Sequence, residues 1–163
     1  MSDSRLEIAA DSLGRCHFCG LVRPESGMIR HLQACTTRRQ VFHLPSSPAT
    51  AASFHLLITP CGSPRVWQHI EVPAHLRMEQ FAEWLTHLWP MLPQGALLIN
   101  HQRVSDHDPI NNLFVPGLIV RYETQDFCLH MQVVSWYDGY SQSDHTFVLM
   151  AQSLETPLNQ SSN

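Results

Sequence analysis

The 163-residue chain contains no lysine, so all ten of its basic residues are arginine. This absence excludes every mechanism that depends on a lysine amine, such as Schiff-base formation with a carbonyl substrate. Glycine is also scarce, at seven residues, and no glycine-rich phosphate-binding loop is present, so nucleotide hydrolysis is not expected. No apolar run approaches the roughly 20 residues of a membrane span, and the acidic first residues lack the apolar core of a secretory signal. We therefore expect a cytoplasmic protein.

The charge that is present is unevenly distributed along the chain. Residues 1–43 hold six arginines and four acidic residues, whereas residues 44–163 hold four arginines and ten acidic residues. Because affinity for nucleic acid depends largely on neutralised phosphates, the acidic second part is a poor nucleic-acid surface. The first part is a weak candidate through its basic side chains, which are Arg23, Arg30, Arg38 and Arg39. Arg38 and Arg39 would equally complement the C-terminus of a helix.

The strongest pattern in the chain is C-x2-C-x11-H-x3-C, which runs from Cys16 to Cys35. Zinc in structural sites is held tetrahedrally by cysteine thiolates and histidine imidazoles. The spacing predicts a tight turn followed by a helix over residues 27–37, capped by Ser26, with two ligands one turn apart on one helix face. We predict one structural zinc ion, closed to water because it has four protein ligands: Cys16, Cys19, His31 and Cys35.

The remaining residues near this pattern, and the two other cysteines, are not expected to bind the metal. His17 lies between the two first cysteines and is expected to point away from the metal. A small apolar cluster is expected around the metal, formed by Phe18, Val22, Met28 and Leu32. It is too small to fold some 30 residues unaided, so metal binding would supply the missing stability. Cys61 and Cys128, in apolar strand contexts, are expected to be reduced thiols, with a disulfide between them as the less favoured alternative.

Composition divides the chain into segments. We predict a leader (1–13), a zinc finger (14–43), a linker rich in serine, proline and alanine (44–53), an α+β domain (54–156) and a disordered tail (157–163). Within the α+β domain, residue periodicity predicts strands at 53–60, 65–72, 96–101, 118–123, 127–136 and 145–152. It also predicts a main helix at 76–89, with Phe81 and Trp89 buried, and a helical turn at 109–114.

These elements define the expected fold class, which is α+β. A small zinc finger precedes a mostly antiparallel sheet with one main covering helix, in the order ββα, strand and β-meander. The early ββα unit followed by a strand is also similar to a β-grasp arrangement.

Several segments together resemble a known family. They are CHFCG and GMIRHLQAC in the finger, then FHLLI, VWQHIEVPAH, LRMEQFAEWLTHLW and NNLFVPGLIVRYE in the body. Over roughly residues 14–156 the chain resembles the zinc-finger-containing branch of the plasmid pRiA4b ORF-3-like family. It departs from that family where YETQD replaces a Y-D-F-G segment and where WPMLPQG replaces a cysteine-rich stretch. The resemblance implies the fold, the zinc and an association with plasmids and mobile elements, but no reaction.

One loop carries a second group of metal-ligand residue types. His101, Asp106, His107 and Asp108 lie close together in sequence, and His130 and His145 lie on later predicted strands. Imidazole and carboxylate suit zinc, iron or manganese, so a metal-dependent hydrolase centred on the His101–Asp108 loop is one hypothesis. The simpler interpretation is a solvated polar loop in which Asp108 and Pro109 begin a turn.

Three functions are consistent with these patterns. The leading hypothesis is a small zinc-binding interaction module without catalysis of its own, which binds a protein partner in a mobile-element or phage-related context. The second is a nucleic-acid-binding protein that uses the zinc finger. The third is the metal-dependent hydrolase of the His101–Asp108 loop.

Overall fold

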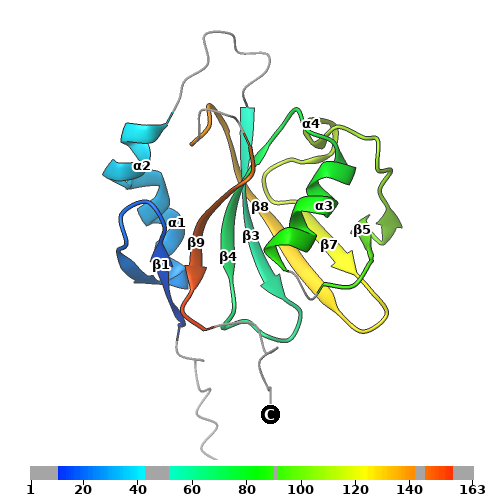
Figure 1. Ribbon diagram of the computed structural model, residues 1–163, viewed down its shortest axis with the longest axis horizontal. Helices are drawn as coiled ribbons and strands as arrows, with labels where there is room; N and C mark the ends of the chain where they lie inside the picture. The colour runs from blue at the N-terminus through cyan, green and yellow to red at the C-terminus, as the bar shows by residue number, and fades with distance from the viewer. Residues whose placement is uncertain (1–10, 43–51, 90–91, 142–145, 156–163) are drawn as a thin grey trace, which may run out of the picture.

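The computed structural model describes residues 11–42, 52–89, 92–141 and 146–155. In these ranges the chain forms an antiparallel sheet of nine strands together with four helices, so the α+β class is confirmed (Figure 1). The strand order is β2-β1-β9-β4-β3-β8-β7-β5-β6. No helix in the described ranges is long and apolar enough to cross a membrane.

The elements follow one another closely along the chain. The first part contains β1 (Leu13–Cys16), β2 (Val22–Pro24), α1 (Glu25–Ala34) and α2 (Thr36–Val41). The second part contains β3 (Ala52–Pro60), β4 (Gln68–Pro73), α3 (Met78–Leu88), β5 (Ala96–Ile99), β6 (Gln102–Arg103), α4 (Ile110–Leu113), β7 (Ile119–Glu123), β8 (Cys128–Asp138) and β9 (Val148–Ser153). Each strand and helix predicted in the second part is present, with ends shifted by up to three residues, and β6 was not predicted.

The main helix, α3, covers one face of the sheet. Figure 1 shows α3 crossing in front of β7 and β8. Its buried face packs on apolar side chains of β3, β4, β7 and β8, and Phe81 lies edge-on to Phe114 at 5.9 Å. Phe81 is completely buried and Trp89 nearly so, which confirms the predicted face of this helix.

The first two helices, α1 and α2, cover part of the opposite face. Successive side chains of a strand point to opposite faces, so Ile70 and Val72 face α3 while His69 and Glu71 face away from it. Glu71 pairs with Arg38 of α2 across that second face. The β8, β7 and β5 part of the same face carries half-buried and exposed side chains, including Ile119, Arg121 and His130.

The strand ladder crosses the boundary that composition suggested at residue 43. Strand β1 pairs with the last strand, β9, from Gly14 opposite Ser153 to Cys16 opposite Ala151. Leu13, expected to belong to a leader, is the first residue of β1. The predicted linker and tail lie outside the described residues, except that Ala52 and Ser53 begin β3.

The prediction that Cys61 and Cys128 are free thiols is wrong, because the two form a disulfide. Cys61 directly follows β3 and Cys128 begins β8, and these neighbouring antiparallel strands place the two Cα atoms 5.3 Å apart. The backbone N–H of Cys61 also donates to the carbonyl oxygen of Cys128 at 2.9 Å. Disulfides persist in oxidising compartments. The free thiols on which the expectation of a cytoplasmic location partly rested are therefore absent at these two positions.

Candidate metal centre

The first two ligand residues lie in a tight turn after β1. Cys16 ends this strand and is buried. Two backbone hydrogen bonds close the turn, from Gly20 N–H to Cys16 O at 2.8 Å and from Cys16 N–H to Leu21 O at 3.0 Å. Gly20 has a φ of 76°, a left-handed conformation that glycine adopts without steric cost. The turn therefore carries Cys19 back toward Cys16.

The other two ligand residues lie at the end of α1. His31 is in the last turn of this helix, and Cys35 is the residue between α1 and α2, with extended backbone angles. The predicted helix over residues 27–37 is present as α1, but its predicted end is wrong, because the chain leaves the helical conformation at Cys35 and starts α2 at Thr36. Ser26 is also not the cap, since the helix begins at Glu25 and the Ser26 hydroxyl contacts the Asp11 carboxylate.

The four predicted ligand atoms converge on one point. One atom each from Cys16, Cys19, His31 and Cys35 lies within 4.8 Å of the other three. The Cys19 Sγ and His31 Nε2 atoms are 3.3 Å apart. Ligand atoms around a tetrahedral zinc ion are roughly 3.3–3.8 Å apart, given its bond lengths, so the group has the donor set of a zinc site and separations compatible with one. His17 is not part of the group.

Burial sets the protonation of two residues in this group. Burial raises the pKa of the Cys16 thiol to about 11. Burial also lowers the pKa of His31, and the positive charge of Arg23 lowers it further. In the absence of a cation, Cys16 is therefore held as a thiol. Because the metal binds the thiolate, binding of an ion releases that proton.

The ligands are part of an apolar cluster that extends into the sheet. Cys16, Cys35, Met28 and Leu32 are buried against side chains of the second part of the chain, which are Trp67, Val148, Met150 and Ala151. Trp67 donates its indole N–H to Ser12 Oγ at 2.7 Å. A Cβ atom at Gly14 would lie 2.1 Å from the Trp67 ring, so this position requires glycine. Of the four predicted members, Met28 and Leu32 are in the cluster, Phe18 packs against it and Val22 is not part of it. The prediction also assigned the cluster to the first part of the chain alone.

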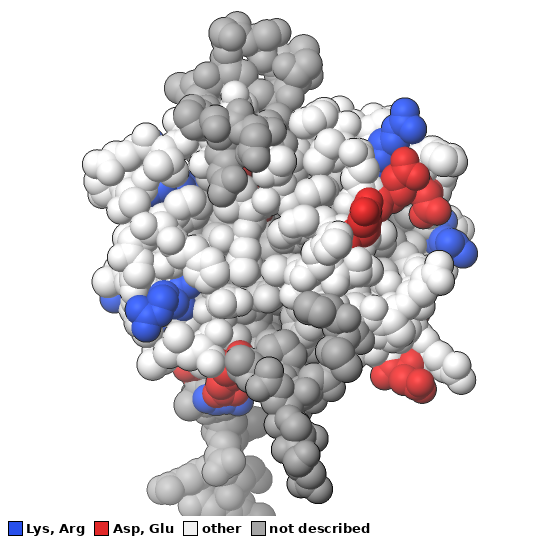
Figure 2. Space-filling view, viewed as in Figure 1, with Lys and Arg blue, Asp and Glu red and all other residues white. Residues whose placement is uncertain are grey.

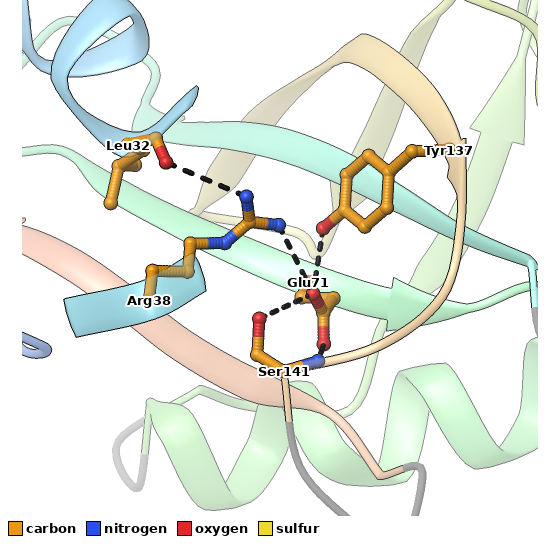
Figure 3. Close-up of polar contacts among 5 residues, drawn as sticks. All are labelled: Leu32, Arg38, Glu71, Tyr137 and Ser141. Carbon is orange, nitrogen blue, oxygen red and sulfur yellow. Dashed lines mark hydrogen bonds and ion pairs between the residues drawn. The ribbon is translucent and has the colours of Figure 1, made fainter. Parts of the chain in front are cut away.

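A buried carboxylate ties the second helix of this segment to the sheet (Figure 3). Glu71 of β4 is fully buried and accepts hydrogen bonds from the Tyr137 hydroxyl at 2.7 Å and from the Ser141 N–H and hydroxyl, both at 2.8 Å. The Arg38 guanidinium lies 3.4 Å from the same carboxylate and also donates to Leu32 O at 3.5 Å. Burial and the neighbouring Glu71 raise the pKa of Tyr137 well above its usual value.

Two histidines extend this polar region between the helices and the sheet. His55 of β3 and His69 of β4 are both buried, with His55 Nε2 2.8 Å from His69 Nδ1. The other ring nitrogen of His69, Nε2, has no hydrogen-bond partner. Burial lowers the pKa of His69 to about 3, and burial together with the His69 and Arg38 charges lowers the pKa of His55. Both rings are therefore neutral at pH 7.

One of the four basic residues proposed for phosphate contact is turned away from the surface. Arg38 turns inward, its side chain is only 12 % exposed, and it pairs with Glu71. Arg23, Arg30 and Arg39 are exposed. In the view of Figure 2, a group of acidic side chains flanked by arginines lies on the α4 and β5 side, and further arginines lie on the β1 and α1 side.

The loop of the hydrolase hypothesis does not gather its side chains. The metal-ligand group described above is the one such group in the described part of the chain, and it contains none of His101, Asp106, His107 or Asp108. The loop instead supports α3, because Asp106 O and Asp108 O accept hydrogen bonds from the backbone of Glu79 and Met78. His145 lies outside the described residues.

A groove opens where α2 meets β8. It has a volume of about 360 Å³, and its lining residues are Gln33, Arg38, Arg39, Phe42, Ser135, Trp136, Tyr137 and Asp138. Trp136 is 49 % exposed, which is unusual for so large an aromatic side chain. Within this lining, the Arg38 guanidinium lies over the Phe42 and Tyr137 rings at 5.2 and 5.0 Å. Sequence reasoning missed this groove, because its walls come from segments about 100 residues apart.

Comparison with known proteins returns no match for this chain among family models, curated proteins or solved structures. The resemblance to the pRiA4b ORF-3-like family therefore rests on the quoted motifs alone.

Proposed function

We propose that this protein is a zinc-stabilised binding module that holds a protein partner in the groove between α2 and β8 and has no catalytic activity of its own. The observation that carries the proposal is the groove between α2 and β8, whose lining includes Arg39, Tyr137 and the half-exposed Trp136. Tryptophan, tyrosine and arginine dominate the energetics of protein interfaces when they line such hollows. All three residue types line this groove, as Trp136, Tyr137 and Arg39.

The zinc ion has a structural part in this function. One wall of the groove is α2, which begins one residue after the ligand Cys35. The other wall is β8, near the centre of the sheet. A zinc ion bound by Cys16, Cys19, His31 and Cys35 would fix the α1–α2 junction, and the Arg38–Glu71 pair would fix α2 against the sheet. Binding would then depend on metal even though no ligand of the metal touches the partner.

The test begins with tagged wild-type protein, a Trp136→Ala variant and a Val115→Ala control in extracts of the source cells. Val115 is exposed in the loop between α4 and β7, away from the groove. A protein retained by wild type and control but lost by Trp136→Ala would then be purified and titrated by calorimetry. We expect Trp136→Ala to weaken that direct interaction at least tenfold, a typical effect at a hot spot. Equal affinity of the three proteins for it would overturn the proposal.

A nucleic-acid role is the second candidate, because bases can stack on an exposed tryptophan beside an arginine such as Arg39. Titration of single-stranded and duplex DNA at several salt concentrations separates this role from the first. A nucleic-acid binder predicts affinity that falls steeply with salt. Elemental analysis of the same preparation addresses the hydrolase hypothesis, since two metal equivalents per chain would revive the His101–Asp108 loop as a second site.

A further inference from the structure

A row of basic and imidazole side chains crosses the open half of the second sheet face. His130 of β8 lies directly opposite Arg121 of β7, Arg121 lies opposite Leu98 of β5, and Leu98 lies opposite Arg103 of β6. Directly opposed residues of antiparallel strands share a face, with Cβ atoms about 4.5–5.5 Å apart. The alternate residues, Val120 and Leu129 among them, are buried under α3. The row therefore faces away from α3.

The row borders a hollow in the surface of about 250 Å³. Its polar lining consists of Arg121, His130, His101 and Asn100, and its apolar lining consists of Leu98 and Ile119. The hollow thus joins one guanidinium, two imidazoles and an amide over two aliphatic side chains. These groups offer hydrogen-bond donors to an anion, and the apolar part offers a surface for a small organic body.

The backbone at His101 supports a role for its side chain. Asn100 and His101 form the two-residue connection between β5 and β6, and both are left-handed, with φ of 50° and 64°. Such hairpin connections favour Asn followed by Gly, because both central residues need a positive φ. Asn100 fits this preference, but His101 occupies the position that glycine fills without strain. A strained residue beside a polar hollow is a feature of functional sites.

Arg121 is held in place before any ligand arrives. Its Nε atom lies 3.1 Å from Glu123 Oε1, and its Nη2 donates to Cys128 Sγ at 3.1 Å. Glu123 offsets one positive charge, while Arg103 at the end of the row adds another. Four arginines and ten acidic residues lie between residues 44 and 163, and two of those four arginines belong to this row. A guanidinium repels cations and fits oxyanions through its planar fork, so the site suits an anion.

We infer that the hollow formed by His101, Arg121 and His130 binds the oxyanion group of a small organic molecule. Arg121 supplies the charged donor, and the two imidazoles and the Asn100 amide supply further hydrogen-bond donors around it. Leu98 and Ile119 contact the body of the molecule. The site is independent of the zinc centre and of the α2–β8 groove. A phosphate ester and a carboxylate share the chemistry that it recognises.

The test uses nuclear magnetic resonance of the histidine Cε1–H groups in the zinc-loaded, full-length protein at fixed pH. Inorganic phosphate and acetate are titrated separately. The signals of His101 and His130 should shift and saturate at millimolar concentration, while that of His87, exposed on α3, should not move. Saturation with phosphate alone identifies a phosphate-bearing ligand, and saturation with acetate alone identifies a carboxylate.

Two variants test the residues themselves. Arg121→Gln should weaken binding at least about tenfold, as expected for loss of a charge-assisted contact, whereas Arg77→Gln, an exposed arginine before α3, should change it less than twofold. His101→Gly should leave the thermal midpoint equal or higher, because glycine suits the left-handed turn, and should still weaken binding several-fold. The inference is overturned if neither anion gives a saturable shift, or if Arg121→Gln and His101→Gly bind as wild type does.

Discussion

The His69 imidazole lies fully buried with one hydrogen-bond partner for its two ring nitrogens. His55 occupies Nδ1, and Nε2 is unpaired. An unmade hydrogen bond in the interior costs about 1–3 kcal/mol, and a charged imidazole there would cost more. The edge of the ring also meets Trp67, at a centroid distance of 5.3 Å. The fold therefore accepts His69 only as a neutral side chain.

This constraint predicts acid sensitivity. The ordinary histidine pKa is 6.5, and that of folded His69 is about 3. Above pH 6.5 both the folded and the unfolded chain hold the ring neutral. As pH falls below 6.5, the unfolded chain takes up a proton that the folded chain refuses, so the free energy of unfolding falls by about 1.4 kcal/mol per pH unit for this residue.

The measurement is urea unfolding at pH 7.5, 6.0 and 5.0 for wild type and His69→Gln. We expect His69→Gln to lose less stability than wild type between pH 6.0 and 5.0, by about 1 kcal/mol. Acid also releases metal, but this affects both proteins, so the difference isolates His69. The exposed His87→Gln serves as control and should follow wild type. Parallel pH curves for wild type and His69→Gln would contradict the assignment.

The six-residue helix α2 is too short to persist alone, so its position depends on contacts with the sheet. The Arg38–Glu71 pair is the central polar contact. Removal of one member of a buried ion pair leaves the other charge uncompensated, which typically costs 3–5 kcal/mol. We expect Glu71→Ala to cost that amount and to increase hydrogen exchange in α2.

Methionine substitutions at Arg38 and at its exposed neighbour Arg39 separate the effect of the ion pair from a general effect on the stability of α2. Arg39→Met replaces the neighbouring exposed arginine and should change the free energy of unfolding by less than about 0.5 kcal/mol. Combining Arg38→Met with Glu71→Gln should cost less than the sum of the single changes. A strictly additive double-mutant cycle would show that the two side chains do not stabilise each other.

At the scale of elements, sequence periodicity was informative where an element is long and buries only one of its faces. The stripe of Met78, Phe81 and Leu85 predicted the buried face of α3, and alternation predicted the strands of the second part. Strands β1, β2 and β6 have four, three and two residues, which is too short for a period to appear. The break at Cys35 was missed because ligand spacing alone is also compatible with a continuous helix.

For the candidate site, the grouping of Cys16, Cys19, His31 and Cys35 could be predicted because metal-binding spacing is local. Their surroundings were not, because β9 lies between β1 and β4 and brings Met150 to the cysteines. The same long-range pairing places Cys61 beside Cys128 and Tyr137 beside Phe42. Such contacts depend on strand order, and no residue pattern within one segment encodes strand order.

Loss of metal should therefore destabilise the whole molecule, and not only the segment that carries the four Cys and His residues. Cys16 and Cys35 share an apolar cluster with Trp67 and Met150 of the central sheet. We expect Cys35→Ser, or a strong chelator, to lower the main thermal transition by about 10 °C or more, equivalent to several kcal/mol in a protein of this size. Hydrogen exchange should rise in β9 as well as in α1.

Elemental analysis before and after chelation measures the zinc content of the protein, with one equivalent of zinc per chain expected in wild type. If residues 11–42 lose protection while β4 and β9 exchange as before, the zinc segment is an independent finger, as composition suggested.

The brevity of the two outermost strands bears on how the protein behaves at high concentration. An exposed sheet edge offers unpaired N–H and C=O groups to neighbouring molecules and promotes aggregation. Here the outer strands are β2, with three residues ending at Pro24, and β6, with two. Proline has no N–H to donate, so β2 can form even fewer bonds than its length allows. Each of the two edges therefore offers a second molecule only a few hydrogen bonds. A broad sheet with such short edges should resist edge-to-edge polymerisation, and light scattering of concentrated samples should stay low.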